Sequence, residues 1–513
     1  MTSLPIYLHN TLTGKKELFT PITTGEVSMY HCGPTVYNYL HIGNLRAYVL
    51  ADTLRRMFEA NGYAIRQVIN ITDVGHLTAN NDEGLGDDGE DKIEKMAKAS
   101  GKTALEIADY YTKVFFDDIY ALGVQTTGTI FPKASEHIVE QIAMIQTLEE
   151  KGFAYKTSDG IYFDTSKYYE YGKLGNINLK GLVEGARIGV NDEKKNITDF
   201  ALWKFSATGV GADGKAVEKR FQEWESPWGV GYPGWHIECS AMSAKYLGNT
   251  FDIHTGGIDH IPVHHNNEIA QSESAHNGSP LAHYWLHNAF VNSGAKDSEN
   301  PNDKSGGKMS KSKGEFTRLV TLVEKGIAPV EYRYWLLQAR YSSQLQYTEE
   351  AVFGAAAGYK NLVAHVAKIL VSSNFSDNIS ANVKVVEESK DTVWNEILSL
   401  INDDLNTPLC ISKLWDILKD DSIEDQTKIE VIKKTDALLG LDLIKSANAH
   451  IDLQKASQVS PDEIPDAIKD LLEKRKNARA DKDWKLSDAL RDEVRGLGFE
   501  ILDSESGQTL KKI

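Results

Sequence analysis

The chain is organised around residues 31–44, HCGPTVYNYLHIGN. Residues 27–32 alternate as the residues of a short strand do. Apolar residues then recur at helical spacing over residues 45–58, until the Asn-Gly pair at residues 61–62 supplies a stop. Residues 67–71 predict a second, buried strand. The pattern therefore predicts a βαβ unit in which residues 31–44 join the first strand to the helix.

The start of this helix has the chemistry of a phosphate site. In a βαβ unit, the helix N-terminus points its unpaired N–H groups and its positive dipole end beyond the strand edge, which favours a nucleotide phosphate. Gly43 lets the backbone approach a ligand closely, and His41 and Asn44 can donate hydrogen bonds to phosphate oxygens. A tetrapeptide of this kind also arises by chance, so its weight depends on a partner motif elsewhere.

The partner motif is KMSKS at residues 308–312, which offers two ammonium groups and two hydroxyls in five residues. Taken alone, it could be a solvated, lysine-rich loop. Together, HIGN at residues 41–44 and KMSKS resemble the paired ATP signatures of class I aminoacyl-tRNA synthetases, HIGH and KMSKS. Asn44 stands where the family usually has histidine, although an amide can still donate a hydrogen bond.

Length and composition exclude several classes of protein. A chain of 513 residues suggests three or four domains. No run of 18 apolar residues and no secretory signal is apparent, so no membrane contact is expected. Three scattered cysteines are too few for a disulfide framework and fit the cytoplasm. A net charge of −17 argues against indiscriminate nucleic-acid binding but allows a local basic face.

The predicted fold class is α/β: a Rossmann-like, doubly wound parallel-sheet catalytic domain with an inserted subdomain, then an α-helical bundle and a small C-terminal α+β module. The last module is expected to have two helices and an edge strand at residues 499–502, after a linker at residues 447–463. The expected segments are a first catalytic half at 1–125, the insertion at 126–222, the second half at 223–315, a helical region at 316–383, the bundle at 384–446 and the C-terminal module at 464–513.

Four residues of metal-binding type are scattered along the chain. His264 and Glu268 are four apart, so on a helix they project from one face. Cys32 follows the first strand, and Cys239 lies far from it in sequence. Without a CxxC pattern, an isolated cysteine is more often a small buried hydrophobe. If strand ends lining one crevice bring these residues together, two thiolates, an imidazole and a carboxylate would suit tetrahedral zinc.

Three further stretches make the resemblance more specific. GPTVY at 33–37, PGWHIECSAM at 233–242 and HHNNE at 264–268, combined with the class I motifs, resemble cysteinyl-tRNA synthetases. The similarity runs through essentially the whole chain. It implies that one zinc ion is bound by Cys32, Cys239, His264 and Glu268.

Neighbouring residues qualify this ligand set. His265 is the adjacent competitor and ranks below His264, because the spacing of four residues from Glu268 fixes the helix face. Asn266 stands where the family pattern has glutamate. Cys410 matches no motif and is expected in the core.

The resemblance implies a two-step reaction. The carboxylate of L-cysteine attacks the α-phosphate of ATP, giving cysteinyl-adenylate and pyrophosphate, and the 3′-terminal ribose of tRNA(Cys) then takes the cysteinyl group. Zinc would select the substrate thiolate, and Mg²⁺ would accompany ATP. The implied catalytic residues are His41, Asn44, Lys308 and Lys311. The implied ATP contacts are Gly33, Pro34, Thr35, His41, Gly43, Asn44, His254, Gly257, Asp259 and Lys311.

The amino-acid pocket and the tRNA surface carry weaker signals. Thr72 and Trp235 match family positions that line the pocket, but a strand-end threonine and a core tryptophan are equally ordinary. The helical regions at 316–383 and 384–446 resemble the family's stem-contact and bundle segments. A basic cluster in the last module would contact tRNA through Lys474, Arg475, Lys476 and Arg479, with Trp484 as a stacking surface. Nearby acidic residues offset this charge, as on an ordinary solvated helix.

Two alternatives stay open at this point. One is a tRNA-independent cysteine ligase that acylates an amino sugar, and the other is a zinc-dependent nucleic-acid-binding protein descended from a synthetase. The C-terminal regions count against the first, and intact His41, Lys308 and Lys311 count against the second. The expected enzyme is a monomeric, cytoplasmic ligase.

Overall fold

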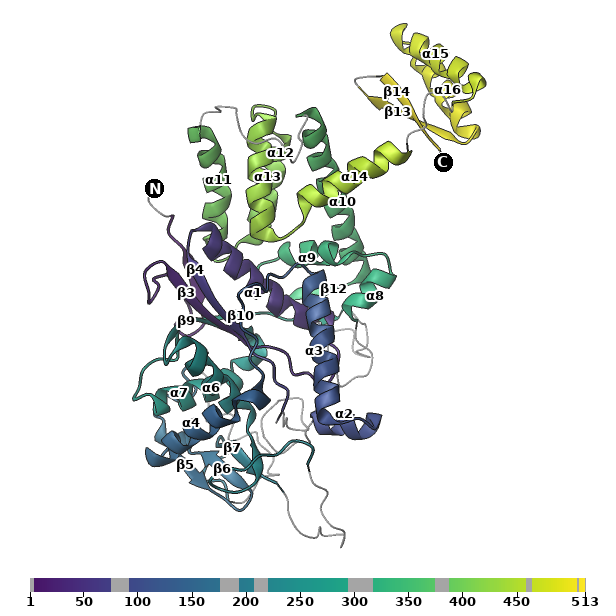
Figure 1. Cartoon of the computed structure of the whole chain (residues 1–513). Coiled ribbons are helices and arrows are strands. Elements are labelled where there is room, and N and C mark those ends of the chain that lie inside the picture. The colour runs from purple at the N-terminus through teal and green to yellow at the C-terminus, as the bar shows by residue number, and fades with distance from the viewer. Residues whose placement is uncertain are drawn as a thin grey trace, which may run out of the picture. The chain divides into compact units, whose positions relative to one another are not determined.

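The computed structural model describes residues 4–74, 92–175, 193–206, 220–293, 317–373, 387–457, 464–504 and 507–512 (Figure 1). The chain divides into two compact units. The larger comprises Met1–Tyr359, Lys384–Asp420 and Lys434–Leu441, and the smaller comprises Lys360–Val383, Asp421–Lys433 and Asp442–Ile513. No helix among the described residues has the length and apolar character needed to span a membrane.

A four-stranded parallel sheet lies at the centre of the larger unit, in the order β10-β9-β3-β4. Its strands are β3 (Glu26–His31), β4 (Ala64–Ile69), β9 (Phe251–Gly257) and β10 (Ala282–Asn288). The helices that connect or flank them are α1 (Ile42–Ala60), α6 (Trp235–Leu247) and α7 (His264–Ala275). The step from β3 to β4 and the step from β9 to β10 run in opposite directions, so right-handed crossovers place α1 and α7 on opposite faces. This arrangement confirms the predicted doubly wound α/β fold and puts its switch point between β3 and β9.

Helix α1 begins and ends close to where the sequence predicts. Its N-terminus is a capping box, in which Asn44 N donates to His41 Nδ1 at 3.1 Å and His41 N donates to Asn44 Oδ1 at 3.2 Å. Asn61 caps its C-terminus, and Gly62 follows with φ +83°. The strand predicted at residues 67–71 is shifted, because β4 begins at Ala64 and ends at Ile69.

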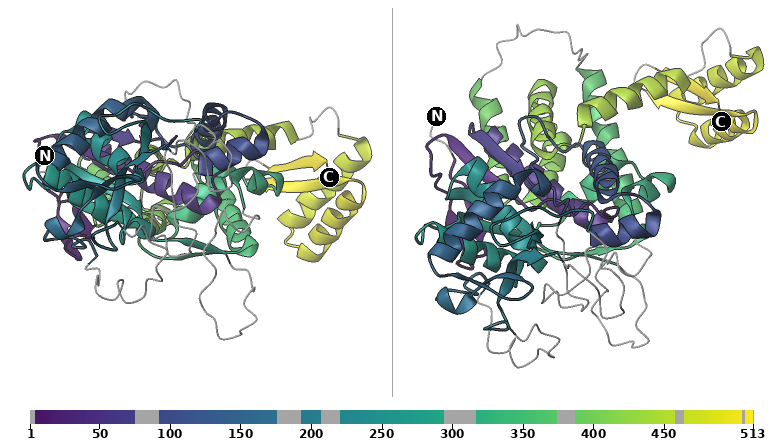
Figure 2. Two further views of the ribbon diagram at one scale, coloured as in Figure 1. Left: turned by 90° about the horizontal axis from the view of Figure 1, so that it is seen from below. Right: turned by 60° about the horizontal axis from the view of Figure 1, so that its bottom comes forward.

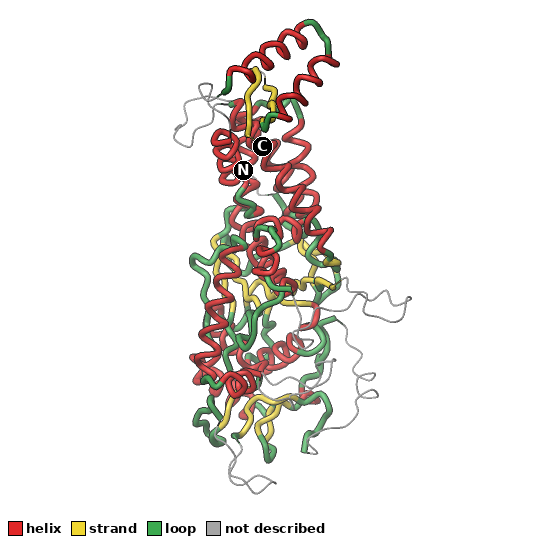
Figure 3. The backbone as a smooth tube through the Cα atoms, turned by 90° about the vertical axis from the view of Figure 1, so that its right-hand side faces the viewer, coloured by secondary structure: helices red, strands yellow, loops and turns green. Residues whose placement is uncertain are grey.

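The inserted subdomain is a four-stranded antiparallel sheet in the order β5-β6-β7-β8. It comprises the 3₁₀ turn η1 (Ala134–His137), α4 (Ile138–Glu150), β5 (Ala154–Lys156), β6 (Gly160–Phe163), the 3₁₀ turn η2 (Thr165–Lys167), β7 (Phe200–Phe205) and β8 (Gly231–Pro233). Helix α4 packs against α6 and α7, and the inserted sheet lies beside these helices (Figures 1 and 2). Figure 3 shows both sheets in yellow, with the inserted sheet at the bottom. The insertion therefore supports the two helices that carry the predicted metal ligands.

The rest of the larger unit is mainly helical. It adds the hairpin β1 (Tyr7–Asn10) and β2 (Lys15–Leu18), the helices α2 (Lys92–Ser100), α3 (Ala104–Ala121), α8 (Leu319–Glu324), α9 (Pro329–Leu337), α11 (Glu387–Ile401) and α12 (Thr407–Lys419), and the paired strands β11 (Val291–Ser293) and β12 (Leu345–Tyr347). Cys410 on α12 is fully buried, as expected for a core cysteine. Helices α10 (Glu349–Ser372) and α13 (Asp425–Leu439) contribute residues to both units.

The smaller unit corrects two expectations. Residues 447–457, predicted as part of a linker, belong to helix α14 (Leu443–Ser457). The predicted edge strand is one arm of a hairpin, β13 (Phe499–Ser504) with β14 (Gly507–Lys512). This hairpin lies beside α15 (Asp466–Ala480) and α16 (Trp484–Gly496), and the module has a core of Ile468, Leu471, Leu490, Val494, Ile501 and Leu510. The second arm was missed because its sequence, GQTLKK, has only one large apolar residue.

A buried ionic cluster holds α1 to the helical part of the larger unit. Asp52 accepts hydrogen bonds from Arg56 Nε at 2.7 Å and from Arg333, and neither Asp52 nor Arg333 exposes its side chain. Arg333 also donates to the carbonyl oxygen of Leu439 at 2.7 Å. Burial by itself would raise the pKa of Asp52, but the two guanidinium groups outweigh it and the pKa is lowered.

Replacing Asp52 by asparagine is expected to reduce the free energy of unfolding by about 3–5 kcal/mol, because two arginines would stay buried without their counter-charge. Since the folded-state pKa is lowered, the wild-type advantage is complete above the unfolded pKa of about 4 and shrinks as the pH falls through it. Urea unfolding at pH 7 and at pH 3.5 measures both effects. Glu59→Gln is the matched control, because the Arg55–Glu59 pair on the same helix is partly exposed and should contribute less than about 0.5 kcal/mol. Equal losses in the two variants would contradict the prediction.

Candidate metal centre and nucleotide site

The predicted metal ligands come from three separate elements at one edge of the parallel sheet. Cys32 directly follows β3, and Cys239 lies on α6. His264 and Glu268 lie one turn apart on α7, which begins at His264, so they project from one helix face as their spacing predicts. One sulfur, nitrogen or oxygen atom from each of these residues lies within 4.8 Å of all the others. The structure therefore brings together four residues that their sequence spacing alone could not unite.

The second atoms of the ligands are held by neighbouring histidines. His264 Nδ1 is 2.9 Å from His236 Nδ1, and Glu268 Oε2 is 2.9 Å from His254 Nε2. Glu268 Oε1 is buried and has no hydrogen bond of good geometry within the described part of the chain, although His264 Nε2 lies 3.0 Å away. Metal-binding histidines and carboxylates usually have such orienting partners on the atom that does not face the metal. An unpartnered carboxylate oxygen facing two sulfurs and an imidazole nitrogen fits a cation.

A second group of donors overlaps the first. Cys32, His254, His265 and Glu268 also meet the same distance limit, and His265 Nε2 lies 3.2 Å from Cys32 Sγ. His265 Nδ1 is already paired with His287 Nε2 at 2.8 Å. The first group supplies two sulfurs, whereas the second supplies one sulfur and two imidazoles. Thiolate sulfur is a strong ligand for zinc. The chemistry of the donors therefore favours the group with Cys239 and His264.

The charges of these groups depend strongly on one another. A hydrogen bond from Cys32 and the nearby His264 outweigh burial and lower the pKa of the Cys239 thiol to about 6, whereas burial raises the pKa of Cys32 well above its usual value. Burial would lower the pKa of His264, but Glu268 and Cys239 raise it to about 10. Burial would raise the pKa of Glu268, but His254 and His264 hold it far below the ordinary range. Two negative groups beside a single imidazolium leave a net negative charge in a buried site, and a divalent cation compensates such a charge.

The nucleotide motif lies at the start of α1. His41 and Asn44 form the capping box, so Nδ1 of His41 accepts a backbone N–H and the neutral ring carries its proton on Nε2. The side-chain oxygen of Asn44, Oδ1, accepts a hydrogen bond from His41 N. The side-chain nitrogen of Asn44 is therefore the group that can donate to an anion. A Cβ atom at Gly43 would lie 3.0 Å from His41 Nδ1. Local geometry therefore orders the motif as a helix start.

The loop after Cys32 is fixed to the strand end at residues 70–72. Gly33 N donates to Asn70 Oδ1 at 2.8 Å, and a Cβ atom at Gly33 would lie 1.5 Å from the Asn70 carbonyl oxygen. Thr72 N donates to Pro34 O at 3.0 Å, and Thr35 pairs with Thr72 as an isolated bridge. These contacts place the residues predicted to bind ATP and the amino acid on two adjoining loops.

The other predicted site residues lie beside the metal cluster, at the end of β9, or outside the described residues. Trp235 stacks on His264 with ring centroids 4.2 Å apart, so it adjoins the metal cluster. His254, predicted to contact ATP, is fully buried against Glu268 and Trp285. Gly257 ends β9 and Asp259 lies in the 3₁₀ turn η3 (Ile258–His260) that follows, where a Cβ atom at Gly257 would lie 2.4 Å from Asp259 Oδ1. Lys308 and Lys311 lie outside the described residues.

Helix α7 also contacts the inserted subdomain, through two residues that lie between His264 and Glu268 and one that lies farther along the helix. Asn266 Oδ1 accepts from Leu174 N at 3.1 Å, and its amide nitrogen donates to Leu174 O at 3.1 Å. Tyr171 donates to Asn267, and Lys173 pairs with Glu273 at 2.7 Å. A glutamate at residue 266 could accept but not donate, so the departure from the family pattern matches the contact made here.

Comparisons with known proteins place the chain in a family. Residues 18–357 match the family model described as tRNA synthetases class I (C) catalytic domain, and residues 461–510 match the cysteinyl-tRNA ligase anticodon binding domain. Cysteine--tRNA ligase 1 of Burkholderia lata is 42% identical over 99% of this chain and 97% of that protein. Cysteine--tRNA ligase of Treponema denticola is 42% identical over 99% and 100%. The chain belongs to the cysteine--tRNA ligase family. Like the rest of this family, it is a class I aminoacyl-tRNA synthetase.

Solved structures agree on the fold. A leucyl-tRNA synthetase of Agrobacterium radiobacter, in a complex with tRNA, superposes with a TM-score of 0.56 at 12% identity, covering 84% of this chain and 85% of that one. Methionyl-tRNA synthetase of Mycobacterium tuberculosis gives a TM-score of 0.51 at 14% identity, covering 82% and 92%. At these identities the likeness concerns the class I fold alone.

The basic cluster of the anticodon-binding module has mixed surroundings. Arg475 is buried and makes two hydrogen bonds to Asp503, at 2.7 and 2.9 Å, so it joins α15 to the hairpin instead of lining a surface. Arg479 also contacts Asp503 but stays 40% exposed. Trp484 is 58% exposed, and Lys474 and Lys476 are exposed. Burial of Arg475 was not predictable, because its partner lies on a hairpin strand more than twenty residues along the chain.

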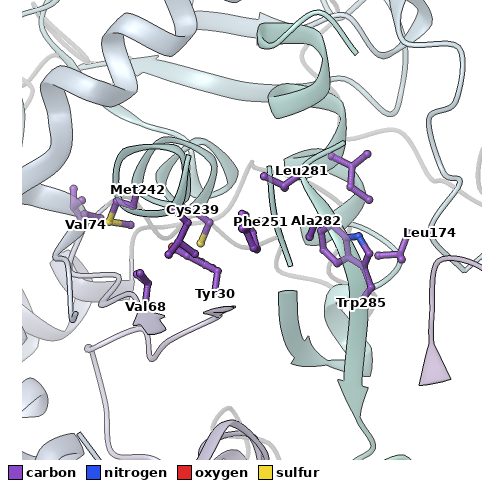
Figure 4. Packing of buried hydrophobic residues seen from close by; sticks show 13 residues of the cluster. Tyr30, Val68, Val74, Leu174, Cys239, Met242, Phe251, Leu281, Ala282 and Trp285 are labelled. Carbon is purple, nitrogen blue, oxygen red and sulfur yellow. The ribbon is translucent and has the colours of Figure 1, made fainter. Parts of the chain in front are cut away.

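Sequence patterns did not predict which residues surround the metal cluster. His236 and Tyr30 were not singled out, and His254 was predicted only as an ATP contact. All three are buried at the cluster, the two histidines against ligands and Tyr30 beside Cys239 (Figure 4). A clue to Tyr30 was present in the sequence. It lies two positions before Cys32, and side chains two positions apart in an extended segment point to the same face. His236 is three residues before Cys239, one helical turn away on α6.

Proposed function

We propose that this enzyme activates L-cysteine with ATP and transfers the cysteinyl group to tRNA(Cys), with Zn²⁺ bound by Cys32, Cys239, His264 and Glu268. The observation that carries the proposal is the convergence of these four side chains, from three elements, within 4.8 Å. When bound, zinc supplies a coordination position that accepts a thiolate in preference to a hydroxyl. Serine would then be rejected at binding, without a separate editing step.

The residues around the start of α1 would act on the triphosphate. The N-terminal N–H groups and dipole of α1 favour phosphate, His41 would donate through Nε2, and Asn44 through its amide nitrogen. Lys308 and Lys311 are proposed to neutralise charge that develops on the α-phosphate, with Mg²⁺ accompanying ATP. The substrate carboxylate is itself the nucleophile, so these side chains orient and stabilise the reacting groups without forming a covalent bond.

The amino acid would lie between the metal cluster and the loop that follows β3. Trp235, stacked on His264, would cover the substrate side chain, and Thr72 would lie at the edge of the pocket. The tRNA would contact the module at residues 464–513, where Arg479 and Trp484 are exposed. The match of residues 461–510 to an anticodon binding domain supports tRNA, and not an amino sugar, as the acceptor.

Cysteine-dependent exchange of pyrophosphate into ATP, without tRNA, tests the adenylation step. The purified enzyme is expected to hold about one zinc per chain and to catalyse exchange with cysteine but not with serine, because a hard hydroxyl is a poor zinc ligand. Metal content and exchange are measured on the same preparation, before and after removal of the metal with a chelator. Exchange that survives complete loss of metal would overturn the role of zinc. No exchange at full metal occupancy would overturn the ligase proposal.

A further inference from the structure

One buried residue beside the metal cluster has a polar group that the fold leaves unsatisfied. Tyr30 lies on β3 two positions before Cys32, so both side chains point to the same face of the sheet, toward α6. Its side chain is completely buried, and its ring packs against His254 and Phe251 with centroids 5.3 and 6.1 Å apart. The Tyr30 ring lies directly beside Cys239 in the core cluster (Figure 4).

The Tyr30 hydroxyl has no hydrogen-bond partner of good geometry among the described residues. Its polar neighbours are the Cys239 and Cys32 thiols and the Glu268 carboxylate. Buried hydroxyl groups nearly always have a partner, since an unsatisfied one is costly. Phenylalanine would fill the same volume without this cost, so the hydroxyl calls for a partner that is stronger than a neutral thiol.

A metal-bound cysteine supplies such a partner. Bound zinc would hold Cys239 as a thiolate, and an anionic sulfur accepts hydrogen bonds more strongly than a thiol does. A neutral phenol beside an anionic sulfur can act as the hydrogen-bond donor. Outside the ligand set, Cys32 lies 3.2 Å from His265 Nε2, Glu268 Oε2 is paired with His254, and His264 Nδ1 lies 2.9 Å from His236 Nδ1. The described contacts of Cys239 are with Cys32 and His264, which are themselves ligands, so the Tyr30 hydroxyl is the neighbour left to orient its sulfur.

We propose that the Tyr30 hydroxyl donates a hydrogen bond to the Cys239 thiolate and is a positioning residue that tunes the affinity of the centre for the substrate thiol. The inference rests on the zinc site of the proposed function. A hydrogen bond withdraws electron density from the sulfur, so the metal stays more electrophilic toward an incoming thiolate. The role concerns cysteine selection and leaves the ATP-binding residues untouched.

Cobalt(II), substituted for zinc, reports on this bond directly through the sulfur-to-cobalt charge-transfer band. In Tyr30→Phe the band is expected to move to lower energy, because the sulfur becomes a stronger electron donor. The KM for cysteine in pyrophosphate exchange is expected to rise about 10-fold or more, with kcat and the KM for ATP unchanged. Tyr284→Phe is the matched control on the same sheet, because its hydroxyl donates to Leu18 O and accepts from Thr20 N, each at 3.0 Å.

A second substitution tests the same bond without removing it. Incorporation of 3-fluorotyrosine at residue 30 keeps the shape but makes the phenol a stronger donor, so the charge-transfer band should move to higher energy. A band and a cysteine KM that match wild type in both variants would overturn the role of Tyr30. Failure of the wild-type enzyme to bind cobalt or zinc would instead overturn the metal site of the proposed function, and the role of Tyr30 with it.

Discussion

Replacement of Gly33 by alanine is expected to destabilise the enzyme by more than about 4 kcal/mol and to abolish pyrophosphate exchange. A Cβ atom at this position would lie 1.5 Å from the carbonyl oxygen of Asn70 and 2.6 Å from its carbon. Both atoms belong to the backbone, so no side-chain rotation relieves the clash. The loop of residues 33–36 would have to separate from residues 70–72, because Pro34 and Val36 are hydrogen-bonded to Thr72. Urea unfolding and the exchange assay measure the two effects.

Gly354→Ala is the matched control for this substitution. Gly354 lies in helix α10 and is exposed, and a Cβ atom added there would meet no other atom within 4 Å. Alanine there should stabilise the enzyme by about 0.5–1 kcal/mol through helix propensity and leave exchange unchanged. If Gly33→Ala behaved like Gly354→Ala, the close approach of the two backbones at Asn70 would be wrong.

Cys239→Ser is expected to lose zinc and to reduce cysteine-dependent exchange by at least about a thousandfold, equivalent to about 4 kcal/mol. Cys239 is 1% exposed and supplies one of the two sulfurs of the cluster. A serine hydroxyl is a hard, weakly acidic ligand, so it replaces a strong bond to zinc by a weak one. Metal analysis and exchange on the same protein link the loss of activity to the loss of metal.

Cys410→Ser controls for the general effect of this change. Cys410 is also buried, but it lies outside the metal cluster, and its thiol donates to the carbonyl oxygen of Ile397 at 3.7 Å. Zinc content and exchange should match wild type, with only a modest loss of thermal stability from burying a hydroxyl. Full zinc occupancy in Cys239→Ser would remove Cys239 from the ligand set and favour the overlapping group with His254 and His265.

Local chemistry in the sequence was sufficient for much of the fold. The spacing of apolar residues after residue 44 predicts α1, and the Asn-Gly pair at 61–62 ends it within a residue of the observed end. The strand expected at residues 27–32 likewise corresponds to β3 at Glu26–His31. Each depends on contacts among residues close in the chain, such as caps, periodicity and turns. The resemblance to cysteinyl-tRNA synthetases, which the comparisons confirm, likewise rests on short contiguous motifs.

Only the tertiary structure decided which distant side chains meet. The parallel order β10-β9-β3-β4 brings the ends of β3 and β9 together, and this places Cys32, Cys239 and His264 in one cluster. The same packing buries Arg475 against Asp503 and leaves the Tyr30 hydroxyl beside Cys239, although local sequence marks the first as a surface cation and the second as a strand residue. Sequence periodicity fixes the face on which a side chain lies. The partner across that face depends on how strands and helices from remote parts of the chain pack, and no local pattern encodes that packing.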